Sequence, residues 1–160
     1  MKKLIVSTMT TLLLVIVLTS AGFAAPGAAE KEFVLKGTFD ATETQQVIPP
    51  IALINATGLG NSTQLGRFTY SLQAELFLPT LTAQATATLI AANGDMIFGE
   101  GVGQGTPTGT PGIVSIVETF TITGGTGRFE GASGSFTVER LINRTTLASS
   151  GTLNGQIVLP

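Results

Sequence analysis

The sequence predicts an all-β protein that folds as a single antiparallel eight-stranded β-barrel. Apolar and polar residues alternate with a period of two along most of the chain, which is typical of strands with one buried face. Clusters of Gly, Pro and Asn interrupt this alternation about every 8–12 residues, which is the spacing of turns in an all-β domain. No segment repeats apolar residues at the helical period over the length of an ordinary helix.

Closure of the sheet is favoured because the chain has no cysteine and must protect its strand edges without disulfides. Its 160 residues suffice for one domain with a substantial core. An open sandwich and a membrane-spanning barrel are the alternatives. The second is disfavoured because the chain has one Tyr, no Trp and no positions for the aromatic girdles of a membrane barrel.

Turn residues divide the first part of the barrel into strands. Pro49–Pro50 ends the first strand, Gly58–Asn61 marks a turn after the second, and Asn93–Gly94 is a two-residue hairpin signal. The fourth segment is rich in alanine, but its strict alternation with threonine favours a strand over a helix. The predicted strands cover residues 33–41, 51–57, 67–76, 81–89 and 95–103.

After a loop over 105–112, the segment Ile113–Arg140 is predicted to form a hairpin, and a last strand covers 147–159. Gly124–Gly127 supplies turn residues that tolerate positive φ. The first strand of the hairpin has one apolar face, made of Val114, Ile116, Phe120 and Ile122.

The N-terminal residues are predicted to be a signal peptide over 1–24, followed by a linker over 25–31 and the barrel domain over 32–160. Two lysines precede an apolar run, and small residues precede a cleavage site after Ala24. A retained membrane anchor is the alternative, which the short run and the lack of a basic stop-transfer patch disfavour. We therefore expect a secreted or periplasmic bacterial protein without a stable membrane anchor.

The composition excludes several kinds of chemistry. The chain has no His and no Cys, so His-based triads, thiol chemistry and ordinary zinc sites are excluded. The acidic residues are scattered singly, so neither a metal nor a cofactor is predicted. The formal charge is −2, or −4 without residues 1–24, and no basic cluster would attract nucleic acid. The glycines over 124–127 join two strands, which indicates a hairpin turn and not a phosphate cradle.

Glu118 is the first candidate catalytic residue because it lies on the apolar face of its strand. A carboxylate inside an apolar cavity can serve as an acid or a base, although a structural ion pair with an arginine is the alternative. Arg140 is the candidate partner. Tyr70, the sole tyrosine, could orient a substrate or simply pack in the core. Glu100 is a second inward candidate, with exposure at a strand end as the alternative.

An apolar cavity is predicted inside the barrel. Small residues such as Ala83, Ala85, Ala87 and Gly134 argue for empty space, although they could equally let larger side chains from opposite strands meet. The residues predicted to line the cavity are Phe68, Leu72, Phe98, Ile116, Phe120, Gly134 and Phe136.

The segment Ile122–Gly134, ITGGTGRFEGASG, is similar to the allene oxide cyclase and dirigent group of eight-stranded barrels. The shared features are a strand, a GG-[ST]-G turn, an aromatic residue and a G-A-x-G return. The resemblance extends over 115–159, and Gly58–Phe68 also resembles a recurring stretch of bacterial secreted proteins with this barrel.

This resemblance implies an antiparallel barrel with an apolar cavity, in a group whose plant members steer the cyclisation or radical coupling of small lipophilic molecules. It implies a carboxylate inside the barrel, for which Glu118 is the nearest candidate, and it makes a homo-oligomer an expected assembly.

Three functional hypotheses follow. The first is an exported, non-enzymatic barrel that binds a small apolar molecule in its interior. The second is a cofactor-free isomerase or cyclase that uses Glu118 as acid or base, with Arg140 or Tyr70 orienting the substrate. The third is a structural or surface-interaction protein whose barrel is filled by side chains. We rank them in this order.

Overall fold

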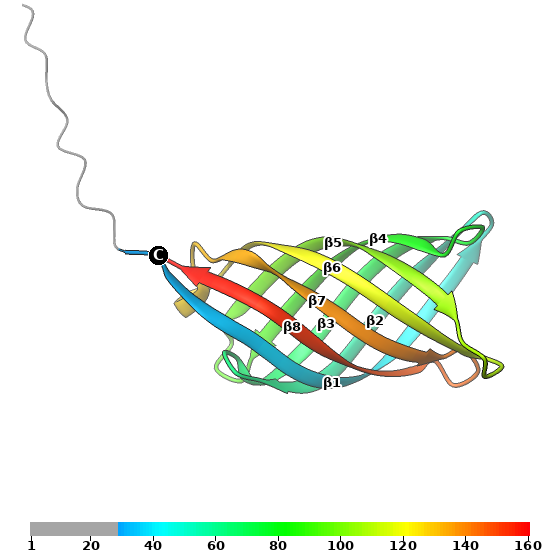
Figure 1. The fold of residues 1–160 in the computed structure, drawn as a ribbon, viewed down its shortest axis with the longest axis horizontal. Helices are drawn as coiled ribbons and strands as arrows, with labels where there is room; N and C mark the ends of the chain where they lie inside the picture. The colour runs from blue at the N-terminus through cyan, green and yellow to red at the C-terminus, as the bar shows by residue number, and fades with distance from the viewer. Residues whose placement is uncertain (1–28) are drawn as a thin grey trace, which may run out of the picture.

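The computed structural model describes residues 29–160, and the predicted signal peptide lies outside the described residues. These residues form a closed antiparallel barrel in which each strand pairs with its sequence neighbours and the first strand pairs with the last (Figure 1). The predicted fold class is confirmed. No helix within 29–160 is long and apolar enough to cross a membrane. The elements are β1 (Lys31–Ile48), β2 (Ile51–Ser62), β3 (Gly66–Phe77), β4 (Thr82–Ala91), β5 (Met96–Pro107), β6 (Ile113–Gly125), the 3-10 helix η1 (Gly127–Phe129), β7 (Ser133–Asn143) and β8 (Ala148–Leu159).

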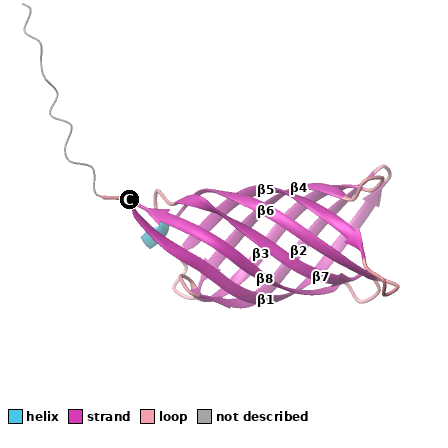
Figure 2. Cartoon of the chain, viewed as in Figure 1, coloured by secondary structure: helices cyan, strands magenta, loops and turns pink. Residues whose placement is uncertain are grey.

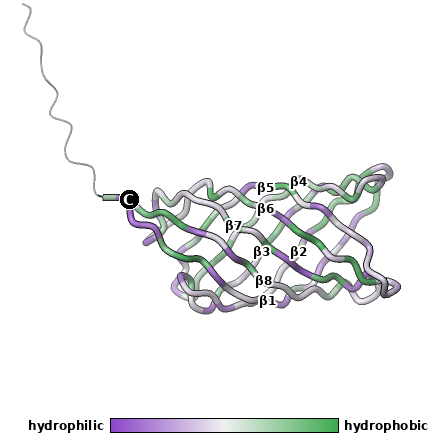
Figure 3. Tube along the Cα trace, in the orientation of Figure 1, coloured by the Kyte–Doolittle hydropathy of each residue, from purple (hydrophilic) through white to green (hydrophobic). Residues whose placement is uncertain are grey.

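The alternating sequence pattern turns one face of each strand toward the interior. Along β3, the side chains of Phe68, Tyr70, Leu72 and Ala74 are buried, and the residues between them are exposed or half-buried. Figure 3 shows the alternation of hydrophobic and hydrophilic positions along the trace. The interior is therefore filled mainly by apolar side chains, whose burial stabilises the fold by about 25 cal/mol per Å² of apolar surface.

The two halves of the barrel are filled differently. The half next to both ends of the described chain contains η1 (Figures 1 and 2). The opposite half carries the turns β1–β2, β3–β4, β5–β6 and β7–β8. We call the first the packed half, defined by Phe39, Phe68, Tyr70, Phe120, Phe129 and Phe136, and the second the open half, defined by Glu43, Ile54, Leu76, Ile116, Glu118 and Arg140.

Aromatic rings fill the packed half. The ring centroids of Phe39 and Tyr70 are 4.6 Å apart, and Phe120 stacks on Phe136 with centroids 5.0 Å apart. Phe129 of η1 is 1% exposed and belongs to the same core. Such rings bury large apolar areas in defined geometry, so this half is packed like the interior of a stable domain.

Inward-facing glycines give these rings room. Gly60 pairs with Phe68, and a Cβ atom at Gly60 would lie 2.5 Å from Cζ of the Phe68 ring. Gly58 pairs in the same way with Tyr70. The predicted turn over Gly58–Asn61 is therefore wrong, because these residues lie within β2. Their glycines serve close approach of a neighbouring side chain and not reversal of the chain.

The inward face of β5 carries Ile97 followed by glycines, whereas Phe98 and Val102 lie on its outer face. Gly99 is buried, whereas Val102 is 63% exposed and Glu100 is exposed. Phe98, which was predicted to line the cavity, pairs with Thr88 on the outer side of β4 and is half-buried. The predicted orientation of Phe98 is wrong because glycines occupy the inner positions of β5, so its apolar alternation follows the outer face.

Other predicted boundaries need smaller changes. The alanine-rich segment over 81–89 is a strand, as predicted, and forms most of β4. The loop over 105–112 is shorter than predicted because β5 continues to Pro107, which pairs with Val114. The glycine-rich turn after β6 leads into η1, where Gly127 adopts a φ of +59° that favours glycine.

Candidate functional site

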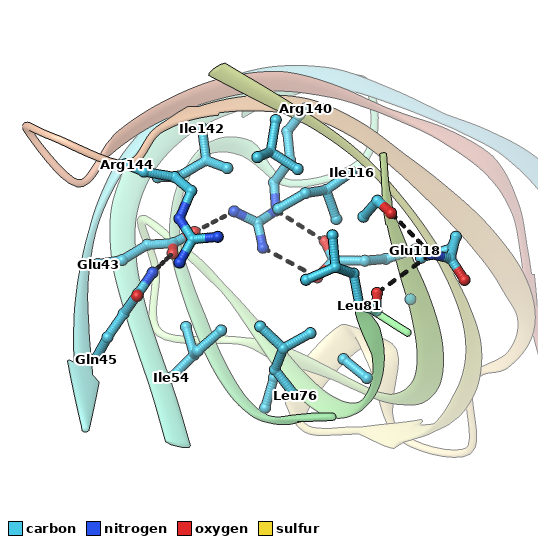
Figure 4. Close-up of a pocket in the computed structure, with 16 residues that line it drawn as sticks. Glu43, Gln45, Ile54, Leu76, Leu81, Ile116, Glu118, Arg140, Ile142 and Arg144 are labelled. Atoms are coloured by element: carbon cyan, nitrogen blue, oxygen red, sulfur yellow. Dashed lines mark hydrogen bonds and ion pairs between the residues drawn. The ribbon is translucent and has the colours of Figure 1, made fainter. Parts of the chain in front are cut away.

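Three charged side chains meet inside the open half of the barrel. Arg140 of β7 donates from Nε to Oε2 of Glu118 on β6 at 2.9 Å, and from Nη2 to Oε1 of the same carboxylate at 3.1 Å. Its Nη1 donates to Oε1 of Glu43 on β1. The guanidinium therefore lies between two carboxylates from strands far apart in the sequence (Figure 4). We call Glu43, Glu118 and Arg140 the charged cluster.

Strand register and glycines position the charged cluster. Arg140 pairs with Ile116, so it lies one inward position away from Glu118 on the neighbouring strand, within diagonal reach. On their other sides, Glu118 pairs with Gly103 and Arg140 pairs with Gly151. A Cβ atom at Gly103 would lie 2.8 Å from Cγ of Glu118. The glycines therefore leave the space that the long charged side chains occupy.

The charged cluster is almost fully buried, with exposed fractions of 5% for Glu43, 2% for Glu118 and 4% for Arg140. Burial alone would lower the pKa of Arg140. The hydrogen bond and charge of Glu118, together with the charge of Glu43, outweigh burial and raise this pKa, so the guanidinium stays charged. Two carboxylates face one guanidinium, which gives the cluster a formal charge of −1. Removing Arg140 would leave two buried carboxylates without a compensating charge.

Two buried hydroxyl groups lie near the charged cluster without a hydrogen-bond partner among the described residues, Oη of Tyr70 and Oγ of Ser149. Burial raises the pKa of Tyr70, and the nearby charge of Glu118 raises it further, so its phenol stays neutral. Ser149 pairs with Ala41 and with Ile142. Ala41 is two residues from Glu43 along β1, and Ile142 is two residues from Arg140 along β7. Buried polar atoms normally form a hydrogen bond, so each of these hydroxyls is expected to bind a water molecule or a ligand.

A cavity of about 50 Å³ lies beside the charged cluster and reaches the rim of the open half. A water molecule needs about 10–15 Å³ of such space, so the cavity holds a few waters or one compact chemical group. Its walls are mainly apolar, and the exposed Arg144 stands at its rim (Figure 4). The lining residues are Glu43, Gln45, Ile54, Ala74, Leu76, Leu81, Ala83, Gly103, Gln104, Gly105, Val114, Ile116, Glu118, Arg140, Ile142 and Arg144.

The β3–β4 turn forms one side of the rim of the cavity and is hydrogen-bonded to β5. Nε2 of Gln104 donates to the carbonyl oxygens of Thr80 at 3.0 Å and of Gly105 at 2.7 Å. The amide of Gly105 donates to the carbonyl oxygen of Leu81 at 2.8 Å. Leu81 has a φ of +55°, a conformation that side chains other than glycine adopt at a cost, and its side chain lines the cavity. These hydrogen bonds therefore hold the turn in place at the entrance of the cavity.

The structure brings together only some of the residues singled out from the sequence. Glu118 and Arg140 form a direct ion pair, and Tyr70 lies close enough for their charges to act on its phenol. Ile116 lines the cavity, whereas Gly134 pairs with Ile157 in the packed half. Four residues that were predicted to line the cavity belong to the hydrophobic core instead and do not line the observed cavity. They are Phe68, Leu72, Phe120 and Phe136.

Glu43 is a member of the site that the sequence analysis missed. It continues the inward alternation of Phe39 and Ala41 along β1, which the sequence analysis traced only to Ala41 although it placed the end of the strand at Pro49–Pro50. Tracing the alternation to that end would have placed Glu43 and Gln45 inside the barrel. Ser149 had no comparable signal, because its segment carries few apolar residues to define a face.

The charged cluster can supply charge and hydrogen bonds to a bound molecule. Both oxygens of Glu118 already accept from Arg140, so use of this carboxylate as an acid or base would compete with the ion pair. Within residues 29–160, no group of three or more His, Cys, Asp and Glu side chains is placed to hold a metal ion.

The closed antiparallel barrel of this chain has the fold of a dirigent protein of known structure. The solved structure of the pterocarpan synthase dirigent protein GePTS1 matches it with a TM-score of 0.63, covering 94% of this chain and 99% of that chain. The two sequences are 14% identical, so the likeness concerns the fold. No protein-family model and no curated protein matches the sequence.

Proposed function

We propose that this protein binds a small, mainly apolar molecule at the open half of its barrel. The observation that carries the proposal is the cavity that joins an apolar wall to buried charges. Ile54, Leu76 and Ile116 line it together with Glu118 and Arg140. Small-molecule sites combine a mostly apolar lining with a few fixed polar groups in this way.

The size of the cavity limits how such a ligand is held. About 50 Å³ admits a polar head group but not a whole drug-sized molecule. The head group therefore enters beside the charged cluster, and the apolar remainder lies across the rim near Leu81.

The two other functions receive less support. An isomerase or cyclase would use Glu118 as acid or base, but this carboxylate is held at both oxygens by Arg140. A structural protein with a filled barrel agrees with the packed half and does not account for a buried charged cluster beside a cavity.

Export is the second part of the proposal. The N-terminal pattern supports a signal peptide that is removed after Ala24. Intact-mass measurement of the protein from its own host tests this directly. We expect a chain that begins at Ala25 in the medium or periplasm, and a full-length chain confined to the cytoplasm would refute export.

Native mass spectrometry of the protein purified gently from its own host tests ligand binding. We expect a reproducible extra mass that is released on denaturation. Ala83→Phe places a ring in the cavity and should abolish this mass, whereas Thr82→Phe adds the same ring at the neighbouring exposed position and should retain it. A bare polypeptide mass, together with no uptake of apolar dyes, would overturn the proposal.

A further inference from the structure

The charged cluster restricts the chemistry of the head group that the cavity can accept. We propose that the ligand carries a compact ammonium group and that the barrel rejects carboxylates such as fatty acids. This inference rests on the proposed function, because it names the ligand class of the same cavity.

Arg140 resembles the arginine of a carboxylate-binding site, but its N–H donors already bind the carboxylates of Glu118 and Glu43. Its Nε and Nη2 hold both oxygens of Glu118, and its Nη1 holds Glu43. An entering carboxylate would have to displace one of these side chains. The displaced carboxylate would then remain buried without a counter-charge, which is a costly arrangement.

The surplus charge of the cluster favours a cation. Glu43 and Glu118 face a single buried guanidinium, and all three side chains are at most 5% exposed. A buried charge is stabilised when an opposite charge approaches it away from water. An ammonium group beside the two carboxylates would supply the missing positive charge.

Hydrogen-bond acceptors for an ammonium group are also available. Each ionised carboxylate offers more lone-pair sites than the hydrogen bonds that Glu118 and Glu43 make. Tyr70 is 1% exposed, its phenol oxygen has no hydrogen-bond partner among the described residues, and all three charges of the cluster act on it, although it is not one of the residues that line the cavity.

Among the described residues that line the cavity, Arg144 is the one positive charge besides Arg140, and it lies at the rim (Figure 4). Its side chain is exposed, so water and salt screen it far more than the buried cluster. Arg144 lies at the entrance of the cavity. There it can repel an ammonium group, but it cannot neutralise the buried carboxylates of Glu43 and Glu118. We therefore expect Arg144 to weaken amine binding only slightly.

A matched series of hexyl compounds tests the head group. Isothermal titration at about pH 7, where the amine is protonated and the acid ionised, compares hexylamine, 1-hexanol and hexanoate with the purified protein. We expect hexylamine to bind at least about tenfold more tightly than 1-hexanol, and hexanoate not to bind. Equal or tighter binding of 1-hexanol or hexanoate would overturn the ammonium inference and leave the proposed function standing. Failure of all three, with no native extra mass, would overturn both.

Charge variants test whether the charged cluster causes the preference for hexylamine. Glu43→Gln removes the surplus charge with little change of shape, so the preference for hexylamine over 1-hexanol should fall to within about threefold. Glu139→Gln makes the same change at an exposed position next to Arg140 and should leave the preference intact. An unchanged preference in Glu43→Gln would overturn the inference. If that variant does not fold, the wild-type hexyl series decides alone.

Discussion

The packed half of the barrel excludes water with stacked aromatic rings, whereas the open half buries three charges beside a cavity of about 50 Å³. The same strands build both halves. Phe120 and Glu118, for example, are consecutive inward residues of β6, and Phe136 and Arg140 both point inward from β7. A shift of a few residues along a strand therefore separates a conventional core from a charged interior.

This difference indicates that stability resides mainly in one part of the barrel and the proposed recognition of a ligand in the other. Aromatic burial stabilises a fold directly, while a buried ion cluster gains little over apolar side chains of similar volume. The packed half is thus expected to set the free energy of unfolding. On the proposed function, the open half retains its charges because they serve a bound molecule.

The largest effect is expected in the packed half. Phe120→Ala removes a fully buried ring that stacks on Phe136 and should lower the free energy of unfolding by about 4 kcal/mol. Phe77→Ala makes the same change at a position that is 41% exposed and should cost less than about 1 kcal/mol. Urea denaturation measures both. Similar losses in the two variants would contradict the assignment of the core.

The next effect concerns the open half. Arg140→Met leaves two buried carboxylates facing each other and should lower the free energy of unfolding by about 3 kcal/mol. The triple variant Glu43→Leu, Glu118→Leu, Arg140→Met removes all the charges and should be at least as stable as the wild type. Chemical denaturation compares the two. A triple variant as unstable as Arg140→Met would show that the charges themselves stabilise the fold.

A smaller effect tests which face of β5 points inward. A Cβ atom at Gly101 would lie 2.8 Å from Cδ1 of Phe120, and it would overlap the carbonyl oxygen of Thr119. Gly101→Ala should therefore cost about 2 kcal/mol through overpacking. Val102→Thr, at the adjacent exposed position, should change stability by less than about 0.5 kcal/mol. Thermal unfolding that ranks these variants in the reverse order would refute the orientation.

The smallest effect is a pH dependence at the boundary between the halves. Burial and the charge of Glu118 raise the pKa of Tyr70 in the folded barrel above its ordinary value of about 10 in the unfolded chain. The unfolded chain therefore loses the phenol proton first. The stabilisation is complete below about pH 10 and is lost above it at about 1.4 kcal/mol per pH unit.

Denaturation between about pH 9 and pH 11 measures this slope, and Tyr70→Phe should reduce it by the same amount. Because Tyr70 is the sole tyrosine of the chain, tyrosinate absorbance reports its ionisation alone. Absorbance that rises near the ordinary pKa while the barrel is still folded would contradict the burial of the phenol.

Sequence alternation predicted the fold because most inward positions carry side chains large enough to mark the buried face. It failed where those positions are glycines. The turn predicted over Gly58–Asn61 belongs to β2, and the inward face of β5 was assigned to Phe98 and Glu100, which lie on its outer face. A glycine that makes room for a neighbouring ring looks, in the sequence alone, the same as a glycine that reverses the chain.

The candidate site was predicted in part for a related reason. Glu118 and Arg140 lie on adjacent strands of one hairpin, so their shared face is visible in the sequence. Glu43 is separated from Arg140 by 97 residues, and the two meet because β1 closes onto β8. The alternation of a strand gives its inward residues but not the stagger at which a barrel closes. Contacts across that closure could not be derived from the pattern.

The pairing of β1 with β8 also determines when the charged cluster forms. Lys31 pairs with Leu159, so the closing ladder joins residues from opposite ends of the described chain. Contacts of such long sequence separation form late and slow the folding of β-proteins. The charged cluster combines β1 with β6 and β7, so it assembles only when the last strand is in place. If the chain is exported, as proposed, and crosses the membrane unfolded, it would therefore cross without the proposed ligand and could bind one only after folding on the other side.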